Sequence, residues 1–272
     1  MKKILTLFLT FVLIVIIVPT TNNVASASTL SSCEIRYTTP QVVQNRSSEV
    51  IYYTNRTVLE QNTTQNNCPY YQNTIYDNAC GAVAGADVIG FYDKYYEDLI
   101  PDYKVYLSNG NYKPTGSTAI PSLISELYTL MRINVDDVGC TQSEFLNGLS
   151  QYVSGKNRSI TYTNAFSNGS INYSTVKSAI DSNNLLIIFC NPTQITTISA
   201  GTGADTLSPT TFTSAHIMIV YGYYKVQYRL TNGSIRTDTY LRVTSGITSP
   251  ANAYYCINTT SDVIDLKQVS IY

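Results

Sequence analysis

The sequence has 272 residues and a formal net charge of −1, and only 13% of its residues are charged. This charge balance excludes the basic footprint that a nucleic-acid-binding protein needs, so we expect no nucleic-acid partner. The length fits a short targeting segment followed by one domain with a sizeable core.

The first 27 residues have the pattern of an export signal. Lys2 and Lys3 precede an uncharged apolar run over 4–18, and Ala-Ser-Ala at 25–27 supplies small residues for cleavage. The apolar run is short for a membrane span. We therefore predict a signal peptide over 1–27, a secreted or cell-surface location in a bacterium of Gram-positive type, and no stable membrane insertion after cleavage. Removing two lysines and no acidic residue changes the net charge from −1 to −3.

Cys33 offers an alternative to simple secretion. Leu-Ser-Ser-Cys at 30–33 resembles a bacterial lipid-attachment box, which would anchor the chain through Cys33. A polar stretch separates this cysteine from the apolar run, whereas lipid-bearing cysteines normally follow that run directly. The six cysteines have no Cys-x-x-Cys spacing, and the chain has one histidine, so we expect no metal site and no cofactor.

The remaining chain predicts a lead-in and one α+β domain. Residues 28–66 are rich in Gln, Asn, Thr and Ser and predict a flexible lead-in, loose edge strands or a short pro-segment, followed by a domain over 67–272. Capping and periodicity signals predict helices after Asp77 or Asn78, near 121, from Thr141 and over 175–181. Apolar runs and an Asn-Gly turn predict strands over 185–190, 216–224, 225–230, 239–243, 254–257 and 269–272.

Cys80 and His216 are the residues best suited to catalysis. Cys80 follows a polar turn and begins a run of small residues, which predicts a thiol at a helix N-terminus, where backbone N–H groups stabilise a thiolate and lower its pKa. His216 is the only histidine, so it is the only imidazole that could serve as the base. The 136 residues between them match the cysteine-to-histidine separation of papain-type proteases.

The surroundings of both residues resemble one family. Asn-Ala-Cys-Gly-Ala-Val-Ala at 78–84 resembles the Cys-Gly-Pro-Thr/Ala-Ala block of the bacteriocin-leader-processing-like peptidases, a branch of the papain-like superfamily. Ala-His-Ile-Met-Ile-Val-Tyr-Gly-Tyr at 215–223 resembles their His-Ala-Val-x-Val-Val-Gly-Tyr strand. The resemblance implies a papain-like fold in which an N-terminal helical half carrying the Cys80 helix packs on a C-terminal antiparallel sheet. It also implies a monomer that hydrolyses peptide or protein substrates through a Cys80 thioacyl intermediate.

The resemblance assigns two further roles. The family's oxyanion-binding glutamine corresponds to Gln72, eight residues before the cysteine, with Asn73 and Asn78 as competitors. The family's third catalytic member, an Asn or Asp after the histidine strand, falls on Thr244 or Ser245, so the chain departs from the pattern there. A hydroxyl can accept the imidazole hydrogen bond but carries no charge. The departure supports an alternative function, a papain-like fold without turnover that acts as an exported binding protein.

Overall fold

A computed structural model describes most of the chain after the predicted signal peptide. The described residues are 34–43, 47–65, 68–72, 76–101, 103, 118–191, 194–246, 253–259 and 262–272. The chain divides into two units, Met1–Glu34 and Ile35–Tyr272, and everything below concerns the second. The predicted signal peptide and the alternative lipid site at Cys33 lie outside the described residues, so both stay predictions.

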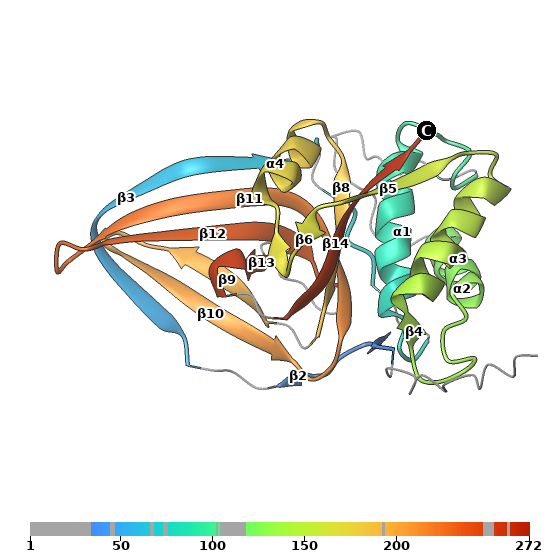
Figure 1. Ribbon diagram of the computed structural model, residues 1–272, viewed down its shortest axis with the longest axis horizontal. Helices are drawn as coiled ribbons and strands as arrows, with labels where there is room; N and C mark the ends of the chain where they lie inside the picture. The colour runs from blue at the N-terminus through green and yellow to red at the C-terminus, as the bar shows by residue number, and fades with distance from the viewer. Residues whose placement is uncertain are drawn as a thin grey trace, which may run out of the picture. The chain divides into compact units, whose positions relative to one another are not determined.

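Four α-helices occur in the described residues. They are α1 (Cys80–Asp93), α2 (Ala119–Leu130), α3 (Gln142–Gly155) and α4 (Tyr173–Asp181). Figure 1 shows α1, α2 and α3 grouped together, with α4 set apart against the sheet. All four helices match predicted segments to within a few residues. In the described part of the chain, no helix has both the length and the apolar character needed to cross a membrane.

The helix starts differ in how they are capped. The Thr141 side chain accepts from the Glu144 N–H and the Glu144 carboxylate accepts from the Thr141 N–H, which confirms the predicted capping box of α3. The predicted cap of α1 is wrong, because Ala79 occupies the N-cap and no side chain caps the helix. Asn78 instead takes a left-handed turn with φ of 58°. The first N–H groups of α1 are therefore left available to the Cys80 side chain.

The strands form one large antiparallel sheet and two small pairs. They are β1 (Arg36–Tyr37), β2 (Val42–Val43), β3 (Glu49–Thr63), β4 (Cys140–Thr141), β5 (Ile160–Asn164), β6 (Phe166–Ser167), β7 (Ser170–Ile171), β8 (Leu185–Cys190), β9 (Gln194–Ala200), β10 (Ala204–Phe212), β11 (His216–Leu230), β12 (Ile235–Thr244), β13 (Ala253–Cys256) and β14 (Val263–Ile271). With the four helices, they confirm the predicted α+β class.

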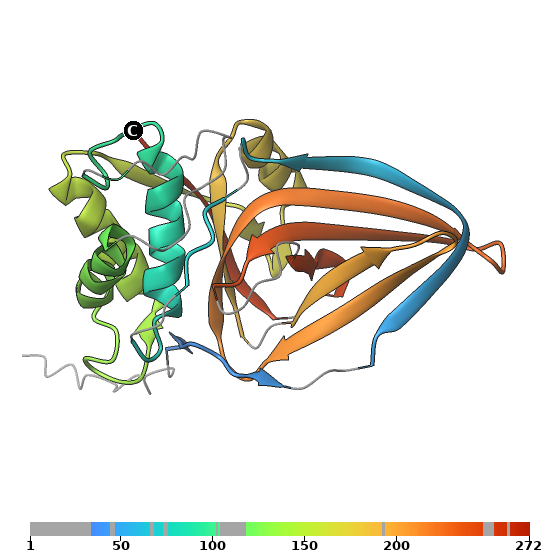
Figure 2. The ribbon, with the colours of Figure 1, turned by 180° about the vertical axis from the view of Figure 1, so that it is seen from behind.

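The topology places the first residues of β11 at the edge of the helical half. Strands β11, β12, β13, β9, β10 and β3 pair in turn, and β3 pairs back with β11, so these six strands close a ring of pairings. Strand β11 continues past the ring and pairs His216 with Cys190 of β8, and β14 and β5 extend the sheet beyond β8. The view from behind shows β8 lying between the ring and α1 (Figure 2).

Residues 28–66, predicted as a flexible lead-in, loose edge strands or a short pro-segment, contain a long strand. Residues 49–63 form the long strand β3, which pairs with β10 through its first four residues and with β11 through most of the rest. The compact unit that contains this strand begins at Ile35. Most side chains of β3 are exposed, so the strand is held by backbone pairing and lacks the apolar pattern that reveals strands in a sequence.

The two faces of β8 and β11 belong to two apolar clusters. Ile217, Ile219 and Tyr221 pack in the cluster that contains α1, α2 and α3. Met218 and Val220 pack in the opposite cluster, which is covered by α4. This alternation follows from the two-residue repeat of a strand. Strand β11 thus joins the helical half to the sheet half.

Close packing of α3 on α2 predicts a strong effect at Gly148. A Cβ built there would lie 2.7 Å from the Met131 backbone nitrogen and 2.8 Å from the Leu130 carbonyl carbon. Backbone atoms cannot move away as a flexible side chain can, so Gly148→Ala should lower the free energy of unfolding by about 2 kcal/mol in urea titrations. Gly155→Ala in the same helix meets no atom within 4 Å and serves as the control. Equal stability of the two variants would contradict this account.

Candidate active site

Cys80 is the first residue of α1 and is almost fully buried. Its side chain is 5% exposed and forms no disulfide bond. The sulfur lies near three backbone N–H groups, its own, that of Gly81 and that of Ile217. The first two belong to the uncapped start of α1, and the third belongs to β11. The thiol therefore sits where the Cys80 helix meets the His216 strand.

The protonation state of Cys80 differs from the sequence-based expectation. Burial raises the pKa of the Cys80 thiol to about 12, although the three neighbouring N–H groups oppose the rise. The sequence predicted a lowered pKa from the helix N-terminus. The helix does supply these N–H groups, but removing the sulfur from water disfavours the thiolate more strongly. In this conformation Cys80 is a neutral thiol at pH 7.

His216 is the first residue of β11 and is fully buried. Its Nε2–H donates to the carbonyl oxygen of Ser245 at 2.7 Å. A carbonyl can only accept, so this bond places the proton on Nε2 and leaves a lone pair on Nδ1. Among the described residues, Nδ1 has no hydrogen-bond partner. The ring therefore presents an unused base to its surroundings.

Burial also determines the charge of His216. It lowers the pKa of the imidazole to about 4, and the backbone carbonyls of Ser245 and Thr38 oppose that decrease. Thr38 lies near the ring but outside hydrogen-bonding geometry with Nδ1. The imidazole is consequently neutral at pH 7, as a general base must be before it accepts a proton.

The structure brings the two elements together without bonding the two side chains. The Cys80 sulfur lies by the N–H of Ile217, the residue that follows His216. No hydrogen bond joins the thiol to the imidazole within the described residues, because the Nδ1 atom is unpartnered there. The ring instead packs beside Phe212, with 5.3 Å between ring centroids. Phe212 belongs to the cluster that contains Met218 and Val220, whereas Cys80 belongs to the cluster that contains Ile217. Proton transfer between thiol and imidazole therefore requires a rearrangement of the site.

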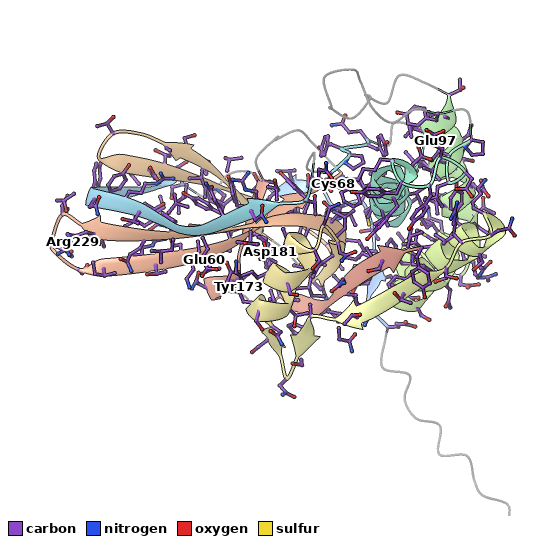
Figure 3. The ribbon with its side chains drawn as sticks, turned by 90° about the horizontal axis from the view of Figure 1, so that it is seen from above. Glu60, Cys68, Glu97, Tyr173, Asp181 and Arg229 are labelled. Atoms are coloured by element: carbon purple, nitrogen blue, oxygen red, sulfur yellow. The ribbon has the colours of Figure 1, made fainter. Side chains whose placement is uncertain are left out.

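Gln72, the predicted oxyanion residue, lies close to the turn at Ser245, whose carbonyl binds His216. Its side-chain Nε2–H donates to the Tyr70 hydroxyl at 3.4 Å. Burial raises the pKa of Tyr70, and hydrogen bonds from the side chains of Gln72 and Ser245 oppose that rise. The Tyr70 hydroxyl therefore connects Gln72 to Ser245. Figure 3 shows Cys68, at the start of this segment, between the end of the sheet and α1.

The competitors of Gln72 receive no support as oxyanion donors. Asn73 lies outside the described residues. The Asn78 side chain donates to the Asn134 amide oxygen on the other side of the turn at 3.3 Å. Gln72 thus remains the proposed oxyanion residue, on the strength of its link to Ser245.

Thr244 has a different partner from the predicted one. Its hydroxyl donates to the Asp87 carboxyl at 3.0 Å, whereas the imidazole of His216 is held by the main chain of Ser245. The structure thus places a carbonyl where the family pattern has an Asn or Asp side chain. Sequence reasoning missed this acceptor because a main-chain carbonyl is present at every position and leaves no signal in the sequence.

Residues of the lead-in segment pack against the site. Tyr37 is 1% exposed, packs edge-on against Phe189 and belongs to the same apolar cluster as Cys80. Burial raises the pKa of Tyr37. The Thr38 N–H donates to the Ala215 carbonyl at 3.1 Å. Tyr37 therefore packs in the same apolar cluster as Cys80, and Thr38 lies beside His216.

Comparison of the sequence with protein-family models and with curated proteins finds no match. The papain-like resemblance consequently depends on the two blocks around Cys80 and His216.

Proposed function

We propose that this protein is an exported cysteine peptidase in which Cys80 is the nucleophile and His216 the base. The observation that carries the proposal is the hydrogen bond from His216 Nε2–H to the Ser245 carbonyl. That bond fixes the tautomer that a base needs and leaves the Nδ1 lone pair without a partner in the described residues. His216 directly precedes Ile217, whose backbone N–H lies by the Cys80 sulfur. A carbonyl acceptor offsets the lack of an Asn or Asp at this position.

The proposed reaction is acyl transfer to sulfur. The Cys80 thiol proton passes to Nδ1 of His216 while the sulfur electron pair bonds to the substrate carbonyl carbon, whose π electrons move onto oxygen. The N–H groups at the start of α1, with Gln72, stabilise that oxyanion, and one such donor is worth about 3 kcal/mol. The amine leaves with the proton from Nδ1. A water molecule, deprotonated at Nδ1, then hydrolyses the thioester and regenerates the thiol.

In this proposal the described conformation is a closed form. Tyr37 packs in the same cluster as Cys80 and Thr38 lies near the His216 ring, and a substrate carbonyl needs the space beside the sulfur. Displacement of this segment would admit water and substrate. It would also remove part of the burial that holds Cys80 and His216 neutral, so that an ion pair could form.

A second candidate is an exported binding protein with a papain-like fold and no turnover. The observation that favours it is the neutral, buried state of both groups, with a pKa of about 12 for Cys80 and about 4 for His216. Buried cysteines are more often small apolar core residues than nucleophiles. This candidate needs no rearrangement at the site, and it predicts that Cys80 can be replaced without functional loss.

Cleavage of a peptide library decides between the two candidates. The mature chain is compared with Cys80→Ala and with a chain that begins at Ser47, because the full chain could be latent. We expect the shortened chain to cleave, and Cys80→Ala in either background to reduce cleavage by at least about 10⁴-fold, the scale of losing a nucleophile. Activity that survives Cys80→Ala would end the peptidase proposal. Absence of cleavage by every folded form would favour the binding protein.

A further inference from the structure

Asp87 is a buried carboxyl on the face of α1 that carries Cys80. Seven residues separate them, which is within about 20° of two full helical turns and about 10 Å along the axis. Asp87 is 1% exposed, and most of the other buried side chains of the helix are small or apolar. A carboxyl in such a place is costly unless it is hydrogen-bonded, so its partners indicate what it does.

The two oxygens of Asp87 hold two segments that are distant in sequence. Oδ1 accepts the backbone N–H of Tyr71 at 2.9 Å, in the segment that precedes α1. Oδ2 accepts the Thr244 hydroxyl at 3.0 Å, at the end of β12. Tyr71 directly precedes Gln72, and Thr244 directly precedes Ser245. Each bond therefore fixes the residue next to one of the proposed site residues.

The turn after β12 lies along α1 between Asp87 and the start of the helix. Thr244 is fixed by Asp87, and Gly246 lies so close to Val83 that a Cβ would be 3.0 Å from Val83 Cγ1. The φ of Gly246 is 68°, a conformation that favours glycine. Ser245 lies between these two anchors, and its carbonyl accepts the Nε2–H of His216. The hydroxyl bond to Asp87 thus sets the direction of that carbonyl.

The segment before α1 is anchored in the same way. The Tyr71 ring lies against Gly90, where a Cβ would come within 2.5 Å of the Tyr71 hydroxyl oxygen. Asp87 binds the backbone of the same residue one helical turn earlier. Tyr71 therefore has two fixed points on α1, and Gln72 extends from it toward the Tyr70 hydroxyl.

We infer that Asp87 is the positioning residue of the site. It holds Thr244, and so Ser245, in the place where the Ser245 carbonyl fixes the tautomer of His216. It also holds the backbone of Tyr71, and so keeps Gln72 close to the Ser245 turn. The role in turnover rests on the proposed peptidase function, whereas the role in fixing the imidazole does not. Asparagine has the same shape and offers one acceptor and one donor, so Asp87→Asn retains both links. Alanine offers neither.

The imidazole can be observed directly, because the chain contains a single histidine. In Asp87→Ala, nitrogen-15 NMR should show a loss of the Nε2–H tautomer, and the His216 pKa should move from about 4 toward 6.5. Where the protein cleaves peptides, kcat should fall on the order of 100-fold with little change in KM, as expected for a misplaced base. Asp87→Asn should restore the tautomer, the pKa and kcat.

Asp93→Ala is the matched control. Asp93 is also a buried carboxyl of α1, and it accepts the Ile100 N–H at 2.7 Å, away from the site. This variant should lose stability without altering the His216 signals or kcat. If Asp87→Ala does not fold, Thr244→Val removes the same link with little change in volume and should alter the tautomer in the same way.

Two outcomes separate this inference from the proposed function. Unchanged His216 signals in a folded Asp87→Ala or Thr244→Val variant would overturn the inference, whatever the activity. In the second outcome, no form cleaves peptides, but the Nε2–H tautomer of His216 is lost in Asp87→Ala and restored in Asp87→Asn. That result would end the peptidase proposal and support the positioning role.

Discussion

A mature chain that begins at Ser47 should react with iodoacetamide at Cys80 on the order of 100-fold faster at pH 7 than the full mature chain. The physical reason is burial, which raises the pKa of the thiol to about 12. Tyr37 packs in the same buried cluster as Cys80 and forms the proposed cover, and only the thiolate is nucleophilic. Return to the ordinary pKa of about 8.5 would raise the thiolate fraction about 10³-fold, and partial exposure gives a smaller gain. Mass spectrometry of the alkylated peptide measures the rate at Cys80.

Point variants of the full mature chain test the same effect if the shortened chain does not fold. Tyr37→Ala opens space near Cys80 and should raise the alkylation rate in the same direction. Tyr254→Ala removes a buried tyrosine from the cluster inside the ring of strands and should leave the Cys80 rate unchanged. Circular dichroism establishes that each variant is folded. The account of the cover fails if the full chain already reacts rapidly at pH 6, or if both Tyr37→Ala and the shortened chain react as slowly as the full chain.

Acid should destabilise the protein through His216 by about 3 kcal/mol. The folded pKa is lowered from 6.5 to about 4 because the ring is buried. The unfolded chain therefore binds a proton below pH 6.5 while the folded chain does not, so the free energy of unfolding falls as pH falls from 6.5 to 4. Each pKa unit corresponds to about 1.4 kcal/mol, which gives this total. Urea titrations at several pH values measure it.

His216→Gln isolates the contribution of the imidazole. Glutamine can still donate to the Ser245 carbonyl but does not titrate. Burial raises the pKa of Asp93 to about 7 and that of Asp87 above its usual range, and these groups change stability with pH in the opposite direction. The difference between the wild-type and His216→Gln curves cancels them. A difference that stays constant between pH 7 and 4 would show that His216 titrates normally in the folded protein.

The helices could be predicted because each carries a local signal. The Thr141 capping box and the apolar repeats of α2 and α3 lie within one or two turns of chain, and the structure confirms them. The ring of strands could not be predicted to the same extent. Strands β9 and β10 are rich in Thr and Ser and only partly buried, so they lack the alternation that reveals a strand. The stretch 216–230, predicted as two strands, is the single strand β11.

Asp87 carries a signal in the sequence itself. A carboxyl seven residues after Cys80, in a helix made mostly of small and apolar residues, falls on the same helical face as the thiol. That pattern alone marks Asp87 as a buried polar group in need of partners. The partners themselves, Tyr71 and Thr244, lie 16 residues before it and 157 residues after it, and nothing local identifies them.

The sequence by itself determined which groups the site has to work with. It contains one imidazole and a cysteine that begins a helix of small residues, and it has neither Asn nor Asp at the expected third position. Only the tertiary structure decided how these groups are held and charged. The Ser245 carbonyl accepts the hydrogen bond of the imidazole, Tyr37 packs in the same cluster as Cys80, and Thr38 lies near His216. Protonation and hydrogen-bond geometry depend on burial by residues distant in the chain, so they become determined only when those residues pack together.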